Sequence, residues 1–415
     1  MRNQKGIALM MVISAIMLLS MVILEFVYST NINYKIAVNE RERLQAFYLA
    51  ESALNLMKVE IKIDKQLKYQ IASSPIASAI NNLPINLSEP MCQQFPFSTA
   101  LIRGFFMGGA LPVMPGSEVA GPAEGKEPEK DSSATAFESE SAQEFLAFDG
   151  DFDGQCEDEG GKINFNYFYG VDPAQQALSG NNPYDSYKIL IANFLKQERF
   201  SKLFTGITPE KIDESVRNVA DWVDKNDVIN ELGNMTQGME DSLYTNENDA
   251  KPVNAKLLSL DEIHLVDGID DTWFMPVQDM FTVYGDNKVN VCIAEDEVVW
   301  TLILAYAAQN PNLPPLNQKD PELKKKLVDT VKFGCTGAQA QVNKIAADLD
   351  AALGIGSQSQ GSTTGGFANF ITTESRYFSL KLTGQVNETM VNIMTVLDIK
   401  NTDPKRWRML YYKVY

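Results

Sequence analysis

The chain begins with a long apolar segment behind a short basic one. Residues 7–24 carry no charged side chain, and Ser14 and Ser20 are their only polar side chains. A run of this length is at the threshold for a helix that crosses a bilayer. Arg2 and Lys5 precede the run, so the positive-inside rule leaves residues 1–6 in the cytoplasm. The run does not end in the small residues of a cleavable secretory signal, so the pattern predicts a single-pass anchor.

The helical pattern continues beyond the apolar run. Residues 32–63 contain neither Gly nor Pro, and their apolar side chains recur at spacings of three, four and seven. This predicts one helix from Ile7 to about Ile61, about 80 Å long at the rise per residue of an α-helix.

The rest of the chain divides into helical and strand-like parts. Helical patterns predominate in the middle, and two-residue alternation returns near the end. Two stretches rich in small and polar residues, 115–143 and 354–366, are expected to be surface loops. The predicted helices are 187–204, 209–223, 260–266, 295–308 and 321–331, and the predicted strands are 375–383, 391–399 and 407–415.

Charge and composition narrow the function. The chain has 415 residues, and 36 basic against 54 acidic side chains give a net charge of −18. Such a surface repels phosphate backbones and argues against nucleic acid as a partner. His264 is the only histidine, which excludes most Ser-His-Asp, Cys-His and histidine-rich zinc sites.

Two acidic clusters are candidate cation sites. Asp149, Asp151 and Asp153 match the first half of a calcium-binding loop, with Glu157 at position nine, but position twelve is Gly160 instead of glutamate. The alternative is a solvated acidic turn. The second candidate set is Asp221, Asp224, Asp227, Glu240 and Asp241.

In the second set, Asp221 and Asp224 are three residues apart at a predicted helix end and share a face. Burial of several carboxylates without a cation would be costly, so this spacing favours a metal. The alternative is that these side chains only cap helices and form turns.

The N-terminal junction resembles the leader of the type IV pilin superfamily. Lys5-Gly6 stands immediately before the apolar run, and precursors of this superfamily are cut after such a glycine and methylated on the new N-terminus. The resemblance implies a mature chain that starts at Ile7. It departs at the fifth mature residue, which is usually glutamate and here is Met11. In a filament that glutamate is thought to pair with the amine of the next subunit, so its absence suits a subunit with none above it; the alternative is that Met11 only improves the anchor.

The middle of the chain resembles the general secretion pathway K family, the tip minor pseudopilins of type II secretion systems. The ordered stretches that carry this resemblance include Glu157-Asp158-Glu159-Gly160-Gly161-Lys162-Ile163-Asn164 and Val219-Ala220-Asp221-Trp222-Val223-Asp224. It departs at Val291-Cys292 and through insertions at 93–147 and 354–369.

The resemblance implies an α+β fold, with a pilin-like long N-terminal helix on an antiparallel sheet and a large inserted helical domain. The expected parts are a leader (1–6), a transmembrane or filament-core helix (7–28), its periplasmic continuation (29–63), the first part of the α/β unit (64–171), the inserted domain (172–350) and closing strands (351–415).

The resemblance also implies a non-catalytic protein of the bacterial inner membrane, with its C-terminal domain in the periplasm. Members of the family bind calcium, and the second acidic cluster matches them best. The implied partners are other minor pseudopilins, the major pseudopilin, the prepilin peptidase, the inner-membrane secretion platform and secreted substrates.

Four cysteines allow three connectivities. Disulfides are favoured if the domain is periplasmic. We favour Cys292 with Cys335, because both flank helices of the implied inserted domain, which leaves Cys92 with Cys156. Four buried free thiols are the alternative.

Three other functions compete. A minor pilin of a type IV pilus would share the N-terminal features but not the K-like middle. Residues 260–269 resemble half of a helix-hairpin-helix DNA-binding motif, but acidic side chains surround its turn. A membrane-anchored acid hydrolase would need a carboxylate pair, and none stands out from the acidic background.

We predict cleavage after Gly6 and methylation of Ile7. Mass spectrometry of the purified protein should find a methylated N-terminal Ile7, and a bulky residue in place of Gly6 should leave uncut precursor in the membrane. An intact Met1, or a cut beyond Leu24, would contradict the pilin interpretation.

Overall fold

The computed structural model describes residues 5–73, 89–94, 97–99, 148–173, 182–231, 236–246, 250–310, 313–336, 340–355, 366–401 and 403–415, with only the backbone at 5–8, 97 and 236–237. Residues 1–4, the predicted loop 115–143 and most of the predicted loop 354–366 lie outside these ranges.

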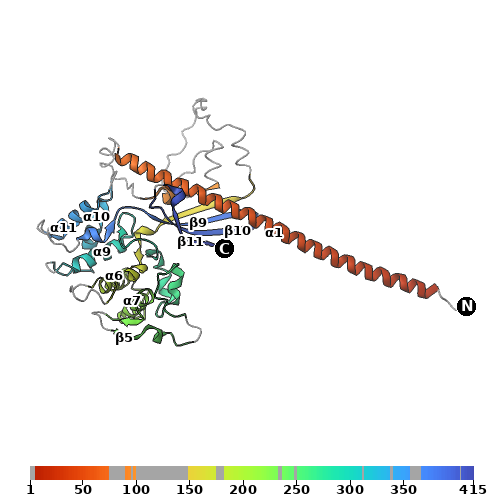
Figure 1. The fold of residues 1–415 in the computed structure, drawn as a ribbon, viewed down its shortest axis with the longest axis horizontal. Helices are drawn as coiled ribbons and strands as arrows, with labels where there is room; N and C mark the ends of the chain where they lie inside the picture. The colour runs from red at the N-terminus through yellow and green to blue at the C-terminus, as the bar shows by residue number, and fades with distance from the viewer. Residues whose placement is uncertain are drawn as a thin grey trace, which may run out of the picture.

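A single helix, α1 (Lys5–Ser73), dominates the shape of the molecule. It is 69 residues long, which corresponds to about 100 Å. Its first part projects away from the rest of the protein, and its second part lies across a sheet (Figure 1). The helix therefore extends beyond the predicted end near Ile61, as the absence of Gly and Pro up to Ser73 allows.

The sheet under α1 is antiparallel and has five strands in the order β1-β2-β9-β10-β11. β9 and β10 form a hairpin around Asn387, whose φ of 53° suits a tight hairpin turn. The strands are β1 (Phe97–Ser98), β2 (Asp151–Asp158), β9 (Tyr377–Val386), β10 (Thr389–Asp398) and β11 (Arg408–Val414).

A largely helical domain is inserted between β2 and β9. Its own core runs from Ile163 to Ile371, a wider span than the expected 172–350, because the 3-10 turn η2 (Phe165–Gly170) and the strand pairs at both ends pack into it. Its helices are α6 (Pro183–Leu195), α7 (Pro209–Val223), α8 (Asp271–Phe274), α9 (Asp296–Ala308), α10 (Pro321–Phe333) and α11 (Val342–Leu353).

Short strands and 3-10 turns complete the inserted domain. The strand pairs are β3 (Ile163–Asn164) with β6 (Phe281–Thr282), β4 (Val228–Asn230) with β5 (Thr236–Met239), and β7 (Val289–Asn290) with β8 (Ile371–Thr372). The 3-10 turns are η1 (Glu159–Gly161), η2 (Phe165–Gly170), η4 (Glu198–Phe200), η5 (Glu240–Leu243), η6 (Leu260–Leu265), η7 (Gln278–Met280) and η9 (Phe367–Asn369). Outside the domain lie α3 (Met91–Gln94) and η10 (Pro404–Arg406).

The fold class expected from the sequence is confirmed: the protein is α+β, with a long N-terminal helix on an antiparallel sheet and a large helical insertion. One predicted helix, 187–204, is wrong at both ends. Asn182 caps α6 at Pro183, and the helix ends at Leu195 so that Phe200 and Phe204 can reach the core from separate turns.

The sheet unit and the inserted domain each contain one disulfide. Cys92 in α3 is bonded to Cys156 in β2, and Cys292 is bonded to Cys335 just after α10. This is the connectivity favoured in the sequence analysis. The bonds span 64 and 43 residues, and loops of this size restrict the unfolded chain enough to stabilise the fold by about 4 kcal/mol each.

The contact between α1 and the sheet depends on small residues. Ala46, Ala50 and Ala53 on α1 are completely buried, and Gly384 in β9 lies directly beneath Ala46 and Ala50. A Cβ atom at Gly384 would lie 1.9 Å from the carbonyl oxygen of Ala46 and 2.8 Å from the nitrogen of Ala50. The helix and strand thus approach each other more closely than any side chain at this position allows.

We predict that Gly384→Ala lowers the free energy of unfolding of the sheet by about 3 kcal/mol or more, because a backbone element must move to admit the methyl group. Hydrogen exchange of the β9 and β10 amides measures the loss. Gly170→Ala is the control, since no atom lies within 4 Å of its Cβ position. Native protection in Gly384→Ala would contradict the close packing.

Candidate functional site

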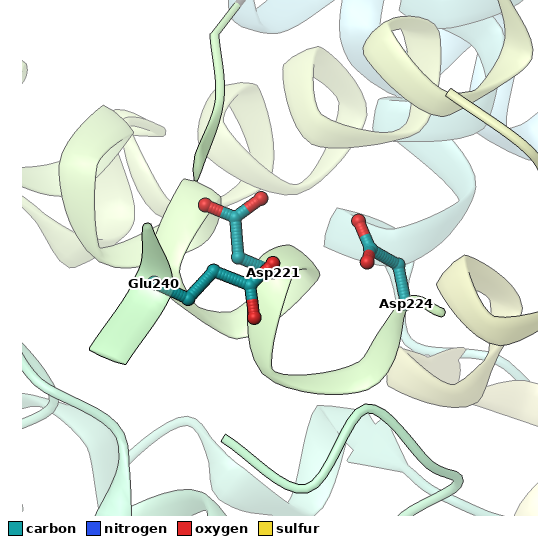
Figure 2. Close-up of side chains that lie close together, drawn as sticks. All are labelled: Asp221, Asp224 and Glu240. Carbon is teal, nitrogen blue, oxygen red and sulfur yellow. The ribbon is translucent and has the colours of Figure 1, made fainter. Parts of the chain in front are cut away.

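Three carboxylates gather inside the inserted domain. Asp221 lies in the last turn of α7, Asp224 ends that helix as its C-cap, and Glu240 begins η5 (Figure 2). Each offers an oxygen within 4.8 Å of the others. All three residues are 3 % exposed or less, so the cluster is closed to solvent.

Local structure explains this convergence. α7 begins at Pro209 behind the cap residue Thr208, and its buried face brings Asp221 and Asp224 inward together. After α7 the chain turns into β4, which pairs antiparallel with β5. Because η5 follows β5 directly, this pairing returns Glu240 to the end of α7.

Donors surround Asp221 and Asp224 on one side. The Asn230 backbone N–H and side-chain amide donate to Asp221 Oδ1 at 3.1 and 3.2 Å, and that amide also donates to Asp224 Oδ2 at 3.0 Å. The Tyr184 hydroxyl donates to Asp224 Oδ2 at 2.6 Å. The backbone N–H of Asn226 donates to Asp224 Oδ1. These bonds fix the orientation of both aspartates.

Three oxygens of the cluster have no such donor. Asp221 Oδ2, Glu240 Oε1 and Glu240 Oε2 are buried and have no hydrogen-bond partner. Buried polar atoms are normally satisfied, and a buried carboxylate without a partner is expensive. A hard divalent cation bound by these oxygens would satisfy them, and oxygen ligands of this kind are what calcium prefers. The residues present therefore fit a calcium ion.

The charge of the cluster also favours a cation. Three ionised carboxylates carry three negative charges, and the buried Lys188, which donates to the carbonyl of Asn230 at 2.8 Å, is already paired with Asp185 at 3.1 Å. A divalent cation would offset two of the three charges. Without a cation, burial raises the pKa of Glu240 to about 9, that of Asp221 to about 7 and that of Asp224 to about 6. A proton is thus the alternative occupant.

Two residues of the predicted set do not join the cluster. Asp227 is exposed, and its Oδ1 accepts from the side-chain amide of Asn254 at 2.7 Å. Asp241 is exposed and forms an ion pair with Lys251 at 3.2 Å. Asn230 and Tyr184, which hold the aspartates, could not be predicted from the sequence, because no spacing rule links them to the acidic residues.

The other candidate cation set is not brought together. Asp151, Asp153 and Glu157 alternate with buried residues along β2, and Asp149 precedes the strand. β2 pairs with β9 over its whole length. A calcium loop needs these oxygens to curl around one point, whereas a strand spreads them out. Phe152, Gly154 and Cys156 alternate with polar residues, and this period-two pattern could have indicated the strand.

The predicted cleavage site and the sole histidine both lie away from the cluster. α1 begins at Lys5, so the backbone at Gly6 and Ile7 is helical, and their side chains are not described. The sole histidine, His264, lies in η6 with its Nδ1 2.7 Å from Asp271 Oδ1. Neither position contributes to the carboxylate cluster.

We predict that calcium stabilises the inserted domain. A ligand specific for the folded state adds about 2.7 kcal/mol at one hundred times its Kd, which corresponds to a rise in melting temperature of roughly 5 °C or more. Asp224→Asn should abolish the shift between calcium and chelator in thermal melts. Asp227→Asn is the matched control and should retain the shift. Equal melts of the native protein in calcium and chelator would contradict the site.

The pH dependence of the metal-free protein follows from the raised pKa values. The folded state holds a proton on Asp221 between about pH 4 and pH 7, and one on Glu240 between about pH 4 and pH 9, that the unfolded state has released, so the free energy of unfolding should fall as the pH rises. Glu240→Gln should flatten this decline. Denaturant titrations in chelator at pH 5, 7 and 9 measure it, and a rise in stability across this range would show that the cluster is not buried as described.

Comparisons with known proteins give one structural likeness to report. No protein-family model matches the chain, and no curated protein matches it. Among solved structures, the chain is similar to a chain in the crystal structure of the GspK-GspI-GspJ complex from the type 2 secretion system of enterotoxigenic Escherichia coli. The TM-score is 0.49 at 12% identity, over 91% of this chain and 99% of that chain. A likeness of this size carries no conclusion about function by itself.

Proposed function

We propose that this chain is a non-catalytic minor pseudopilin of the K type, which caps the tip of a type II secretion pseudopilus and starts its assembly. The observation that carries the proposal is the division of α1. Its first part is apolar and exposed, and its second part covers an antiparallel sheet into which a large helical domain is inserted. This is the architecture that the K-like sequence motifs imply.

The exposed part of α1 provides a membrane anchor. α1 is long enough and apolar enough to cross a membrane. The mean hydropathy of its most apolar window is 2.5, and none of that window is buried. Side chains from Leu9 to Tyr28 would meet lipid instead of water. In this proposal the prepilin peptidase removes the leader, and the rest of the chain lies in the periplasm, where the two disulfides are stable.

The tip position is supported by charge and by size. Met11 lacks the carboxylate that would neutralise the amine of a subunit above it, and an unpaired charge in lipid is costly. The inserted domain extends from Ile163 to Ile371, which makes the head too bulky to repeat along a filament. One copy at the end of the fibre satisfies both constraints.

A structural role also suits the carboxylate cluster. Catalytic carboxylates must reach a substrate, whereas Asp221, Asp224 and Glu240 are closed to solvent. Calcium held there would join α7 to η5 and stiffen the inserted domain. The partners in this proposal are other minor pseudopilins below the head, the major pseudopilin, the inner-membrane platform and secreted proteins that the fibre moves across the outer membrane.

We predict that a cysteine introduced at the exposed residue Tyr34 of α1 forms cross-links to other minor subunits and rarely to a second copy of this chain. The four natural cysteines are all in disulfides, so the new thiol is the one reactive group. Mass spectrometry of cross-linked membranes identifies the partner, and partners from a pilus system would instead indicate a minor pilin.

The matched control is Phe333→Cys on α10, which is 74% exposed and lies in the inserted domain away from the anchor. It should form few of these cross-links. A regular ladder of self-cross-links from Tyr34→Cys would identify a repeating subunit and rule out the tip position.

A further inference from the structure

β11 forms one edge of the five-stranded sheet. It pairs with β10 on one side, and no described strand lies on its other side. The Tyr415 N–H and C=O both bond to Asn392, so residues Lys413 and Tyr411 also face β10 by the alternation of an antiparallel ladder. The backbone groups of Tyr412 and Val414 therefore point away from the sheet.

The side chains along this edge are unusually apolar for an exposed strand. Met409, Leu410, Tyr412 and Val414 are each 38–45% exposed, and Tyr415 is 62% exposed. Exposed strand edges are normally shortened, bent or heavily charged, because they pair with other chains. Here a bulge precedes Tyr411, and the five residues from Tyr411 onward continue without irregularity.

Charge along the edge has the opposite sign to that of the protein. Residues 404–415 contain Lys405, Arg406, Arg408 and Lys413 and no acidic side chain. The chain as a whole carries −18, so the other residues carry −18 − 4 = −22. Arg408 is engaged by Asp398 at 2.7 Å, whereas Lys413 is exposed and forms no ion pair among the described residues.

We propose that β11 is a docking edge for an extended acidic segment of a partner protein, which adds to the sheet as a sixth strand. The outward backbone groups of Tyr412 and Val414 would pair with the incoming strand, and Lys413 would face its carboxylates. A second copy of this chain does not fit, because two such edges would bring Arg408 and Lys413 against the same basic groups. This surface goes beyond the proposed function and does not depend on it.

A defined peptide tests the proposal. The probe is a synthetic seven-residue peptide in which glutamate alternates with valine or tyrosine, added to the full chain in detergent. We expect saturable binding by fluorescence anisotropy, with slowed hydrogen exchange at the amides of Tyr412 and Val414. A peptide with lysine in place of glutamate should not bind, nor should a glutamate peptide N-methylated at alternate residues. Equal binding of either control peptide would overturn the proposal.

Variants of the edge separate backbone pairing from charge. Val414→Pro removes an outward N–H without breaking the ladder to β10 and should abolish binding, whereas Val414→Thr retains the N–H and should bind normally. Lys413→Glu should weaken binding roughly tenfold, since it replaces an opposite-charge pair with a like-charge pair. Lys325→Glu on the exposed face of α10 is the charge control and should change nothing.

A last variant tests whether this chain covers its own edge. Residues 115–147 are acidic overall, and the variant replaces them with a glycine-serine linker of the same length. Binding of the glutamate peptide to the native chain supports a partner protein. Binding only after the replacement would mean that the edge is covered internally, and no binding to either form would mean that it is not a docking edge; each of these two results overturns the proposal.

Discussion

The close approach of α1 to β9 is the contact on which the rest of the fold depends. Gly384 leaves the carbonyl of Ala46 and the nitrogen of Ala50 nearly in touch with the strand. Because β9 is the central strand, this contact positions β2 and β10 on either side of the helix. The inserted domain is connected to the sheet through β2 and β9, so its position depends on the same contact. The long apolar helix and the rest of the protein are thus joined at a contact that only glycine at position 384 allows.

Ion pairs between side chains, as well as the chain itself, connect the inserted domain to the sheet. Arg376 binds Asp398 in β10 through two bonds of 2.9 and 3.1 Å, and it also binds Asp286 of the inserted domain at 2.6 Å. Tyr377 donates to the same Asp286. The guanidinium groups of Arg376 and Arg408 hold the pKa of Asp398 well below its usual range, so this connection persists at every physiological pH. These contacts fix the orientation of the inserted domain on the sheet, and a cation in the carboxylate cluster would stiffen that domain further.

Much of the fold was predictable, because its elements follow simple periodicity. The pattern at 209–223 matches α7 residue for residue, and 391–399 predicts β10 to within two residues. β2 was missed because aspartates that favour turns occupy it, and pairing with β9 overrides that preference. In the site, the shared face of Asp221 and Asp224 was readable, whereas the roles of Asn230 and Tyr184 depend on tertiary contacts that no sequence spacing records.

Localisation of the chain on isolated fibres decides whether a single copy occupies the tip. An epitope placed after Phe333, on the exposed end of α10, would be labelled with gold on pseudopili assembled with this chain as the sole source of the subunit. We expect one label at one end of each fibre. Labels at regular intervals along the shaft, or fibres without any label, would contradict a single copy at the tip.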